Sequence, residues 1–138
     1  MAAALTPETI AERLSGLSTA IPELRLLVLF GSTARGRARA RSDVDLGVQC
    51  DGVADRDALF VAISPRLGTG RIDIVDLRRA PPLLSFQIAR TGRLLFEREP
   101  GAFRAFQSLA SRRYGDAEKF RRSQRRALHA FLEREGLA

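Results

Sequence analysis

The sequence is poor in the residues and runs that mark exported or membrane-bound chains. Its 138 residues include one cysteine, Cys50, so no internal disulfide can form. No stretch approaches the roughly 20 consecutive apolar residues that a membrane-spanning helix needs. The first residues, Met-Ala-Ala-Ala-Leu-Thr-Pro, lack the basic n-region and the long apolar h-region of a signal peptide. These absences predict a cytoplasmic protein without a membrane segment, in which Cys50 is a small buried side chain.

Two common nucleotide-binding motifs are also missing. The Walker A loop needs a lysine, and the single lysine of this chain, Lys119, lies far from any glycine-rich loop. No Gly-x-Gly-x-x-Gly dinucleotide fingerprint occurs. The single histidine, His129, has no cysteine or histidine partner in the sequence, so we expect it to be neither a metal ligand nor a base. The sequence therefore argues against P-loop and dinucleotide-binding folds.

Positive charge is abundant and is almost entirely arginine. The net charge is +7 and the sequence pI is about 11.2. Residues 100–138 hold nine Arg or Lys against four Asp or Glu, which accounts for +5 of the excess. Such a segment can bind nucleic acid or an acidic protein surface, or it can be a solvated helix. The apolar stripe from Phe103 to Phe131 favours protein docking, with nucleic-acid binding secondary.

Hydrophobic periodicity predicts an α+β fold with a mixed sheet. Helices are expected over residues 7 to about 17, 55–67, 82–92 and from 102 onward, and strands over 24–30, 44–50, 71–77 and, at an edge of the sheet, 93–97. The last segment is either one long helix or two helices separated by a kink at Gly115. Residues 36–42 have no apolar face and should form a mobile loop. The side chains expected to face inward on the helix over 82–92 are Leu83, Leu84, Ile88 and Ala89.

The most informative pattern joins a glycine-serine pair to two aspartates. Gly31-Ser32 follows one apolar strand, and ten residues later Asp43-Val44-Asp45 opens the next, so the strands are antiparallel if these ends meet. Asp43 and Asp45 are two residues apart, which puts both carboxylates on one side of an extended chain. Two adjacent carboxylates repel each other unless a cation lies between them. The glycine permits close approach of an anion, and a helix beginning at Ser32 would direct free N–H groups toward it.

These residues resemble a known family signature. Gly31-Ser32-Thr33-Ala34-Arg35-Gly36, followed by Ser42-Asp43-Val44-Asp45-Leu46, is similar to the motif of the minimal nucleotidyltransferases of the DNA polymerase β-like superfamily. Ile72-Asp73-Ile74-Val75-Asp76-Leu77 resembles the family strand that carries a third carboxylate. The resemblance implies one nucleotidyltransferase domain over residues 1–138, with a catalytic core at about 24–98 and a helical segment at about 101–135.

The resemblance also implies a two-metal site for nucleotidyl transfer from ATP. The carboxylates expected to catalyse the reaction and to bind two Mg²⁺ ions are Asp43, Asp45 and Asp73. The residues expected to bind the triphosphate are Gly31, Ser32 and Arg35, and Ser32 is also suited to cap a helix.

The third carboxylate has two candidates on one strand. Asp73 and Asp76 are an odd number of residues apart, so they face opposite sides of a sheet. The resemblance favours Asp73, because it matches the family position. Asp76 is expected to be a strand-end or helix-capping acid, and it remains the alternative for the site.

The acceptor of the nucleotide is expected to be a partner protein. Small stand-alone members of the family act as antitoxins that AMPylate a tyrosine of a helical HEPN-domain ribonuclease toxin, and this chain is similarly short. One alternative is transfer to a small molecule such as an aminoglycoside. Another is a non-catalytic module that binds nucleic acid or protein, which the three acids argue against because a binder does not need them.

Overall fold

The computed structural model describes residues 5–36 and 43–137 of the chain. The mobile loop predicted over residues 36–42, with Arg37, Arg39 and Arg41, lies outside the described residues except for Gly36. The helices are α1 (Pro7–Arg13), α2 (Leu17–Ala20), α3 (Gly31–Ala34), α4 (Arg56–Leu67), α5 (Pro82–Thr91) and α6 (Ala102–Arg134). The strands are β1 (Leu24–Phe30), β2 (Val44–Cys50), β3 (Ile72–Asp76) and β4 (Arg93–Glu97).

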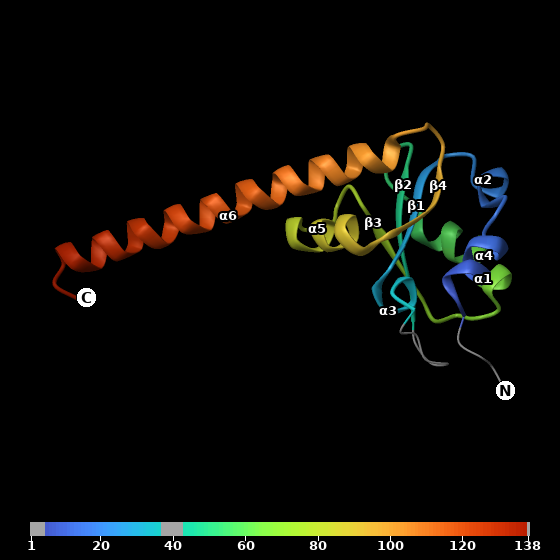
Figure 1. Cartoon of the computed structure of the whole chain (residues 1–138), viewed down its shortest axis with the longest axis horizontal. Helices are drawn as coiled ribbons and strands as arrows, with labels where there is room; N and C mark the ends of the chain where they lie inside the picture. Colours follow the sequence, from blue (N-terminus) through green and yellow to red (C-terminus); the bar gives the residue numbers. More distant parts are fainter. Residues whose placement is uncertain (1–4, 37–42, 138) are drawn as a thin grey trace.

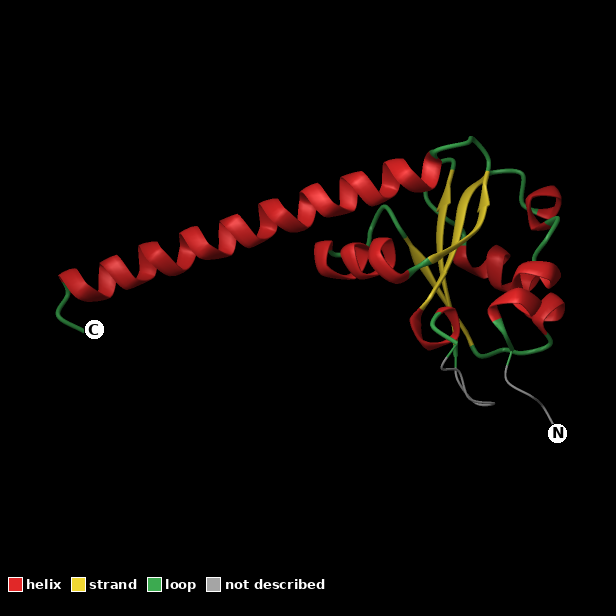
Figure 2. Ribbon diagram, in the orientation of Figure 1, coloured by secondary structure: helices red, strands yellow, loops and turns green. Residues whose placement is uncertain are grey.

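The strands form one mixed sheet in the order β3-β2-β1-β4. β1 is antiparallel to β2 and to β4, whereas β2 and β3 are parallel and are joined through α4. Figures 1 and 2 show the helices in two groups, with α1, α2 and α4 on one side of the sheet and α5 and α6 on the other. The predicted α+β class, the antiparallel β1–β2 pair and the edge position of β4 are confirmed.

The central strand β1 is buried on both of its faces. Leu27 belongs to the larger core cluster, together with Ile63 of α4. Val28 points the other way and packs in a smaller cluster with Ile88 of α5. Because both faces are covered, β1 reads as a nearly continuous apolar run and shows no alternation of polar and apolar residues.

Most helix ends follow the local signals of the sequence. Thr6 and Asp55 cap α1 and α4, each accepting a hydrogen bond at 3.1 Å from the backbone N–H three residues on. Gly68 ends α4 with a φ of +70°. The first helix, predicted to end near residue 17, ends at Arg13. A second short helix, α2, which was not predicted, begins at Leu17 after Gly16, whose φ is +83°.

The predicted inward face of α5 is partly wrong. Ile88 and Ala89 are buried, but Leu83 is 47% exposed. The third buried residue of α5 is Ser85, whose hydroxyl donates to the Ala80 carbonyl at 3.3 Å and so has a partner inside the fold. The buried positions are thus spaced i, i+3, i+4 from Ser85, and this phase turns Leu83 outward.

The last segment is a single helix of 33 residues, α6, with no break at Gly115. Its first part packs against α5, where the Gln107 side chain donates to the Ala89 carbonyl at 3.0 Å. Its second part extends away from the rest of the molecule (Figure 1). Although α6 has the length to cross a bilayer, none of the described helices is both long and apolar enough to do so.

Candidate active site

The carboxylates predicted for the site gather at one end of the sheet. The pairing of β2 with β3 sets Asp45 directly opposite Asp73, on strands that lie about 4.8 Å apart. Asp43 comes just before β2, two residues from Asp45, so its side chain projects from the same face. On the other side of β2, Asp45 is paired with Phe30, the last residue of β1. The fold therefore brings Asp43, Asp45 and Asp73 together where β1 ends.

The surroundings of Asp45 disfavour its negative charge. Burial raises the pKa of Asp45 above its ordinary value, and the negative charges of Asp73 and Asp43 raise it further. All three effects disfavour the ionised form of Asp45. A cation placed between the carboxylates would oppose them, because it replaces repulsion with attraction.

Gly31 is required by the position of Asp45. Its φ is +75°, a conformation that other residues rarely adopt. A Cβ atom at this position would also overlap the Asp45 carboxylate. Gly31 was predicted to let a phosphate approach the backbone. The structure gives a second reason for a glycine here, because the Asp45 carboxylate lies where a side chain would be.

The carboxylate of Asp76, at the end of β3, is hydrogen-bonded to backbone N–H groups. One carboxylate oxygen accepts from the Ala54 N–H at 3.3 Å and the other accepts from the Arg78 N–H at 3.1 Å. These bonds join the loop before α4 to the turn after β3. They support the structural role predicted for Asp76 and favour Asp73, which faces Asp45, as the third acid of the site.

The short helix α3 carries the residues predicted to bind phosphate. Ser32 is its second residue, so the cap position belongs to Phe30, and Ser32 does not cap the helix. Arg35 ends the helix and is exposed. Thr33 is 1% exposed, and its hydroxyl donates to the Asp43 carbonyl at 3.4 Å. Sequence reasoning assigned Thr33 no role, and its position inside the motif was the only signal for one.

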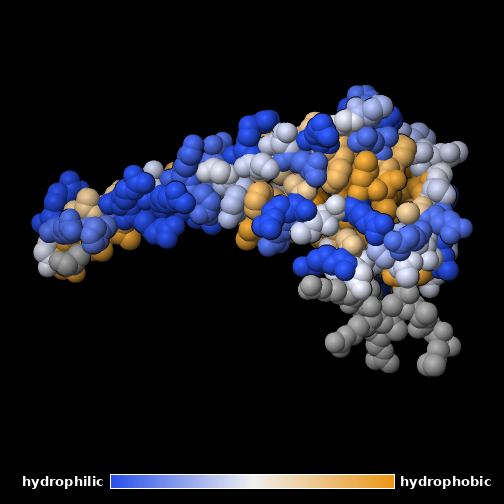
Figure 3. Space-filling model, viewed as in Figure 1, coloured by the Kyte–Doolittle hydropathy of each residue, from blue (hydrophilic) through white to orange (hydrophobic). Residues whose placement is uncertain are grey.

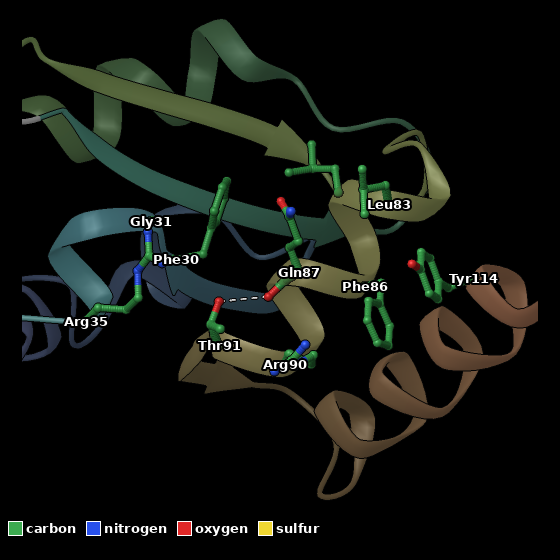
Figure 4. Close-up of a pocket in the computed structure, with 10 residues that line it drawn as sticks. Phe30, Gly31, Arg35, Leu83, Phe86, Gln87, Arg90, Thr91 and Tyr114 are labelled. Atoms are coloured by element: carbon green, nitrogen blue, oxygen red, sulfur yellow. Dashed lines mark hydrogen bonds between the residues drawn. The ribbon is translucent and has the colours of Figure 1, made fainter. Parts of the chain in front are cut away.

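A cavity of about 540 Å³ opens beside α3. Phe30, Gly31 and Arg35 line one side, and α5 lines the other (Figure 4). At its far end the rings of Phe86 and Tyr114 are stacked, 4.2 Å apart and nearly parallel. Sequence analysis missed the α5 contribution, because it considered only the residues of α5 that face the core.

The donor atoms of the site are suited to magnesium. Within residues 5–36 and 43–137, no three His, Cys, Asp or Glu side chains form a ready-made metal cage. Mg²⁺ does not require one, since it is bound through one or two carboxylates while phosphates and waters complete its octahedron. Asp43, Asp45 and Asp73 offer only oxygen, and Asp45 is paired with Asp73 across the two strands. The acids therefore fit Mg²⁺ that arrives with a phosphate ligand.

The chain is similar to known proteins along most of its length. Residues 12–101 match the family described as polymerase beta, nucleotidyltransferase. The chain is 30% identical over 135 residues to the protein adenylyltransferase MntA of Aphanizomenon flos-aquae, an alignment that covers 88% of this chain and 89% of that protein.

Solved structures share the fold over nearly the whole chain. One is a crystal structure of a toxin-antitoxin with AMP-PNP, which matches with a TM-score of 0.69 and 25% identity over 91% of this chain and 99% of that chain. Another contains the tri-AMPylated HEPN toxin of Shewanella oneidensis in complex with an MNT antitoxin. It matches with a TM-score of 0.66 over 91% of this chain and 99% of that chain, and its 22% identity shows the shared fold.

Proposed function

We propose that this chain, which belongs to the polymerase β nucleotidyltransferase family, is an antitoxin that transfers AMP from ATP to a tyrosine of a HEPN-type ribonuclease toxin. The observation that carries the proposal is the pairing of Asp45 with Asp73 beside the Gly31 turn. The relative from Aphanizomenon is a protein adenylyltransferase, and a similar structure is a toxin-antitoxin with AMP-PNP. The first supports AMP as the transferred group, and the second supports an adenine nucleotide as the ligand and a toxin as the partner.

The order of the strands separates the two substrates. Phosphoryl centres are attacked in line, so the attacking and leaving oxygens lie on opposite sides of the phosphorus. Asp73 is on β3, at one edge of the sheet, whereas Gly31 and Arg35 follow β1. Asp45 is on β2, between β3 and β1, and so lies closest to the reacting α-phosphorus in this arrangement. We therefore assign the acceptor to the β3 side and the triphosphate to the β1 side.

Each residue of the site has a distinct role in this arrangement. Asp43, Asp45 and Asp73 would hold two Mg²⁺ ions, which would supply charge stabilisation for the transferred and leaving phosphates. Asp73 orients the tyrosine hydroxyl and accepts its proton. The phenolic oxygen bonds to the α-phosphorus, the bond to the bridging oxygen breaks, and pyrophosphate leaves toward Ser32 and Arg35.

The projecting half of α6 supplies a surface for the toxin. Residues 115–134 form about 30 Å of helix whose apolar side chains continue the stripe that packs on the core. Phe120 is 63% exposed, Leu128 57% and Phe131 48%. In Figure 3 this part is mostly hydrophilic, with hydrophobic side chains along its lower edge. An amphipathic helix with an open apolar face is suited to bind another helix.

Charge favours the toxin over a second copy of this chain as the occupant of that surface. Residues 115–134 contain six basic and three acidic side chains. Pairing two copies would bring like charges together, whereas an acidic helical partner would complement them. The single domain predicted over residues 1–138 would thus combine the catalytic core with its own docking helix. We place the pair in the cytoplasm, where ATP is supplied.

The test is a transfer assay with the product of the gene next to this chain's own, which we expect to be a HEPN-domain protein. The two proteins are mixed with Mg²⁺ and with ATP labelled at either the α- or the γ-phosphate. Label on the partner from α-labelled ATP alone is the expected result, because AMP is transferred and pyrophosphate is lost. Label from γ-labelled ATP would indicate a kinase. Label that appears only on an added aminoglycoside would replace the toxin by a small-molecule acceptor.

A further inference from the structure

The cavity beside α3 has the size and position of a nucleoside site. Its volume of about 540 Å³ lies within the range of about 300–1,000 Å³ that is usual for small-molecule pockets. Gly31 and Arg35, proposed above to face the triphosphate, are part of its lining. A nucleotide whose phosphates lie there can extend its sugar and base only along the cavity or into solvent.

The remaining walls of the cavity suit a flat aromatic ring. Phe30, at the end of β1, and Leu84, on α5, both line the cavity. Such faces bury and stack a base without regard to its identity. Arg90 is held over the Phe86 ring, 5.9 Å from its centroid, and both side chains line the cavity.

Gln87 is the residue that can distinguish one base from another. Figure 4 shows its carboxamide projecting from α5 into the space beside Phe30. Apart from the backbone hydrogen bonds of α5, the hydrogen bond at this residue is made by its backbone carbonyl, which accepts from the Thr91 hydroxyl at 2.8 Å. Across the described residues, no hydrogen bond involves the Gln87 carboxamide. Its N–H₂ donor and its oxygen acceptor are therefore both open to a ligand.

We infer that this cavity binds the adenosine part of ATP and that Gln87 reads the edge of the adenine ring. The inference rests on the proposed nucleotidyl transfer and names the residue that selects its base. The carboxamide oxygen accepts from the adenine N6 amino group, and its N–H₂ donates to a ring nitrogen beside it. Paired contacts of this kind are the usual way in which Gln recognises adenine.

The experiment compares ATP and GTP binding by the parent chain and by Gln87→Glu. Affinities are measured by calorimetry with Mg²⁺ and non-hydrolysable triphosphates, without any acceptor. A carboxylate only accepts hydrogen bonds, so it cannot donate to the adenine ring nitrogen, but it can accept from both N1–H and the N2 amino group of guanine. We expect the ratio of ATP to GTP affinity to fall about tenfold or more. Ser108→Glu, on an exposed part of α6, is the matched control for added charge.

The outcomes separate this inference from the proposed function. An unchanged ATP-to-GTP ratio in Gln87→Glu, with tight ATP binding retained, would overturn the role of Gln87. If the same variant kept that ratio but raised the KM for the protein acceptor, the cavity would be assigned to the acceptor and the inference would also fail. A parent chain that bound no triphosphate would contradict the proposed function itself. The ratio is the decisive readout, because a charge effect on the common triphosphate cancels in it.

Discussion

At the scale of single residues, the position of the Asp45 carboxylate explains why residue 31 is a glycine. The carboxylate occupies the space that a side chain at position 31 would fill, and the turn of the glycine leads directly into α3. A sequence pattern shows both residues but not their contact, since they come together only when β1 pairs with β2. The contact makes the glycine a requirement of the acid site as well as of the phosphate site.

Gly31→Ala should therefore lower stability and activity together. The positive φ alone costs a non-glycine residue about 1–2 kcal/mol, and the overlap with Asp45 adds to this cost. Chemical denaturation of Gly31→Ala, Asp45→Ala and the double variant measures the coupling between the two sites. We expect the alanine at position 31 to be less destabilising when Asp45 is already absent. Equal cost in both backgrounds would show that the contact is unimportant.

Asp45→Asn should stabilise the metal-free protein at neutral pH. The folded state raises the pKa of Asp45, so the parent is most favoured below the ordinary aspartate pKa and loses stability as pH rises through the raised value. Asparagine avoids this loss. The difference in Tm between variant and parent should be positive at pH 7 and shrink toward pH 3. Asp116→Asn, on the exposed surface of α6, is the control, and a lower Tm for Asp45→Asn at pH 7 would contradict the electrostatic account.

Asp73→Asn and Asp76→Asn should fail in different ways. Loss of the Asp73 carboxylate should lower kcat about 10²–10⁴-fold, the usual value of a positioned acid or base, with little effect on folding. Loss of Asp76 should cost about 1–3 kcal/mol of stability, because its two backbone hydrogen bonds weaken, while folded protein stays active. Melting curves and transfer rates on the same samples separate the two. A fully active Asp73→Asn would move the third carboxylate to Asp76.

At the scale of elements, the sequence predicted features that depend on neighbouring residues better than features that depend on tertiary packing. The three central elements β1, β2 and α4 follow apolar runs and caps, which are properties of neighbouring residues. The exposure of Leu83 depends on how α5 meets the rest of the fold, and the predicted burial of this side chain is wrong. The short helix α2, which follows Gly16, was not predicted. The three acids were named from their motif, whereas the α5 wall of the cavity has no motif and needed the structure.

At the scale of the whole molecule, α6 links the catalytic core to a surface outside it. Leu128→Glu should weaken binding of the HEPN partner at least about tenfold, because it places a charge within the exposed apolar stripe. Ala130→Glu adds the same charge two residues on, away from that stripe, and should bind like the parent. Affinity is measured by calorimetry with the purified partner. If both variants bound equally well, the docking surface would lie elsewhere.

The same helix also allows nucleic acid to be tested as a partner. Binding of duplex DNA or RNA through phosphate contacts should weaken steeply as salt increases. We expect only weak binding at physiological salt, because a continuous apolar stripe contributes nothing to phosphate contacts. Tight binding under those conditions, measured by fluorescence anisotropy, would make nucleic acid the main partner of α6.

The most direct test of the central claim is the intact mass of the HEPN partner after incubation with this chain, Mg²⁺ and ATP. We expect a mass increase of one or more AMP units, located on tyrosine. The rate of this modification should fall about 10²–10³-fold with Asp45→Asn, since metal-based charge stabilisation is worth several kcal/mol. An unmodified partner that still forms a stable complex with this chain would contradict adenylyl transfer and leave a binding antitoxin.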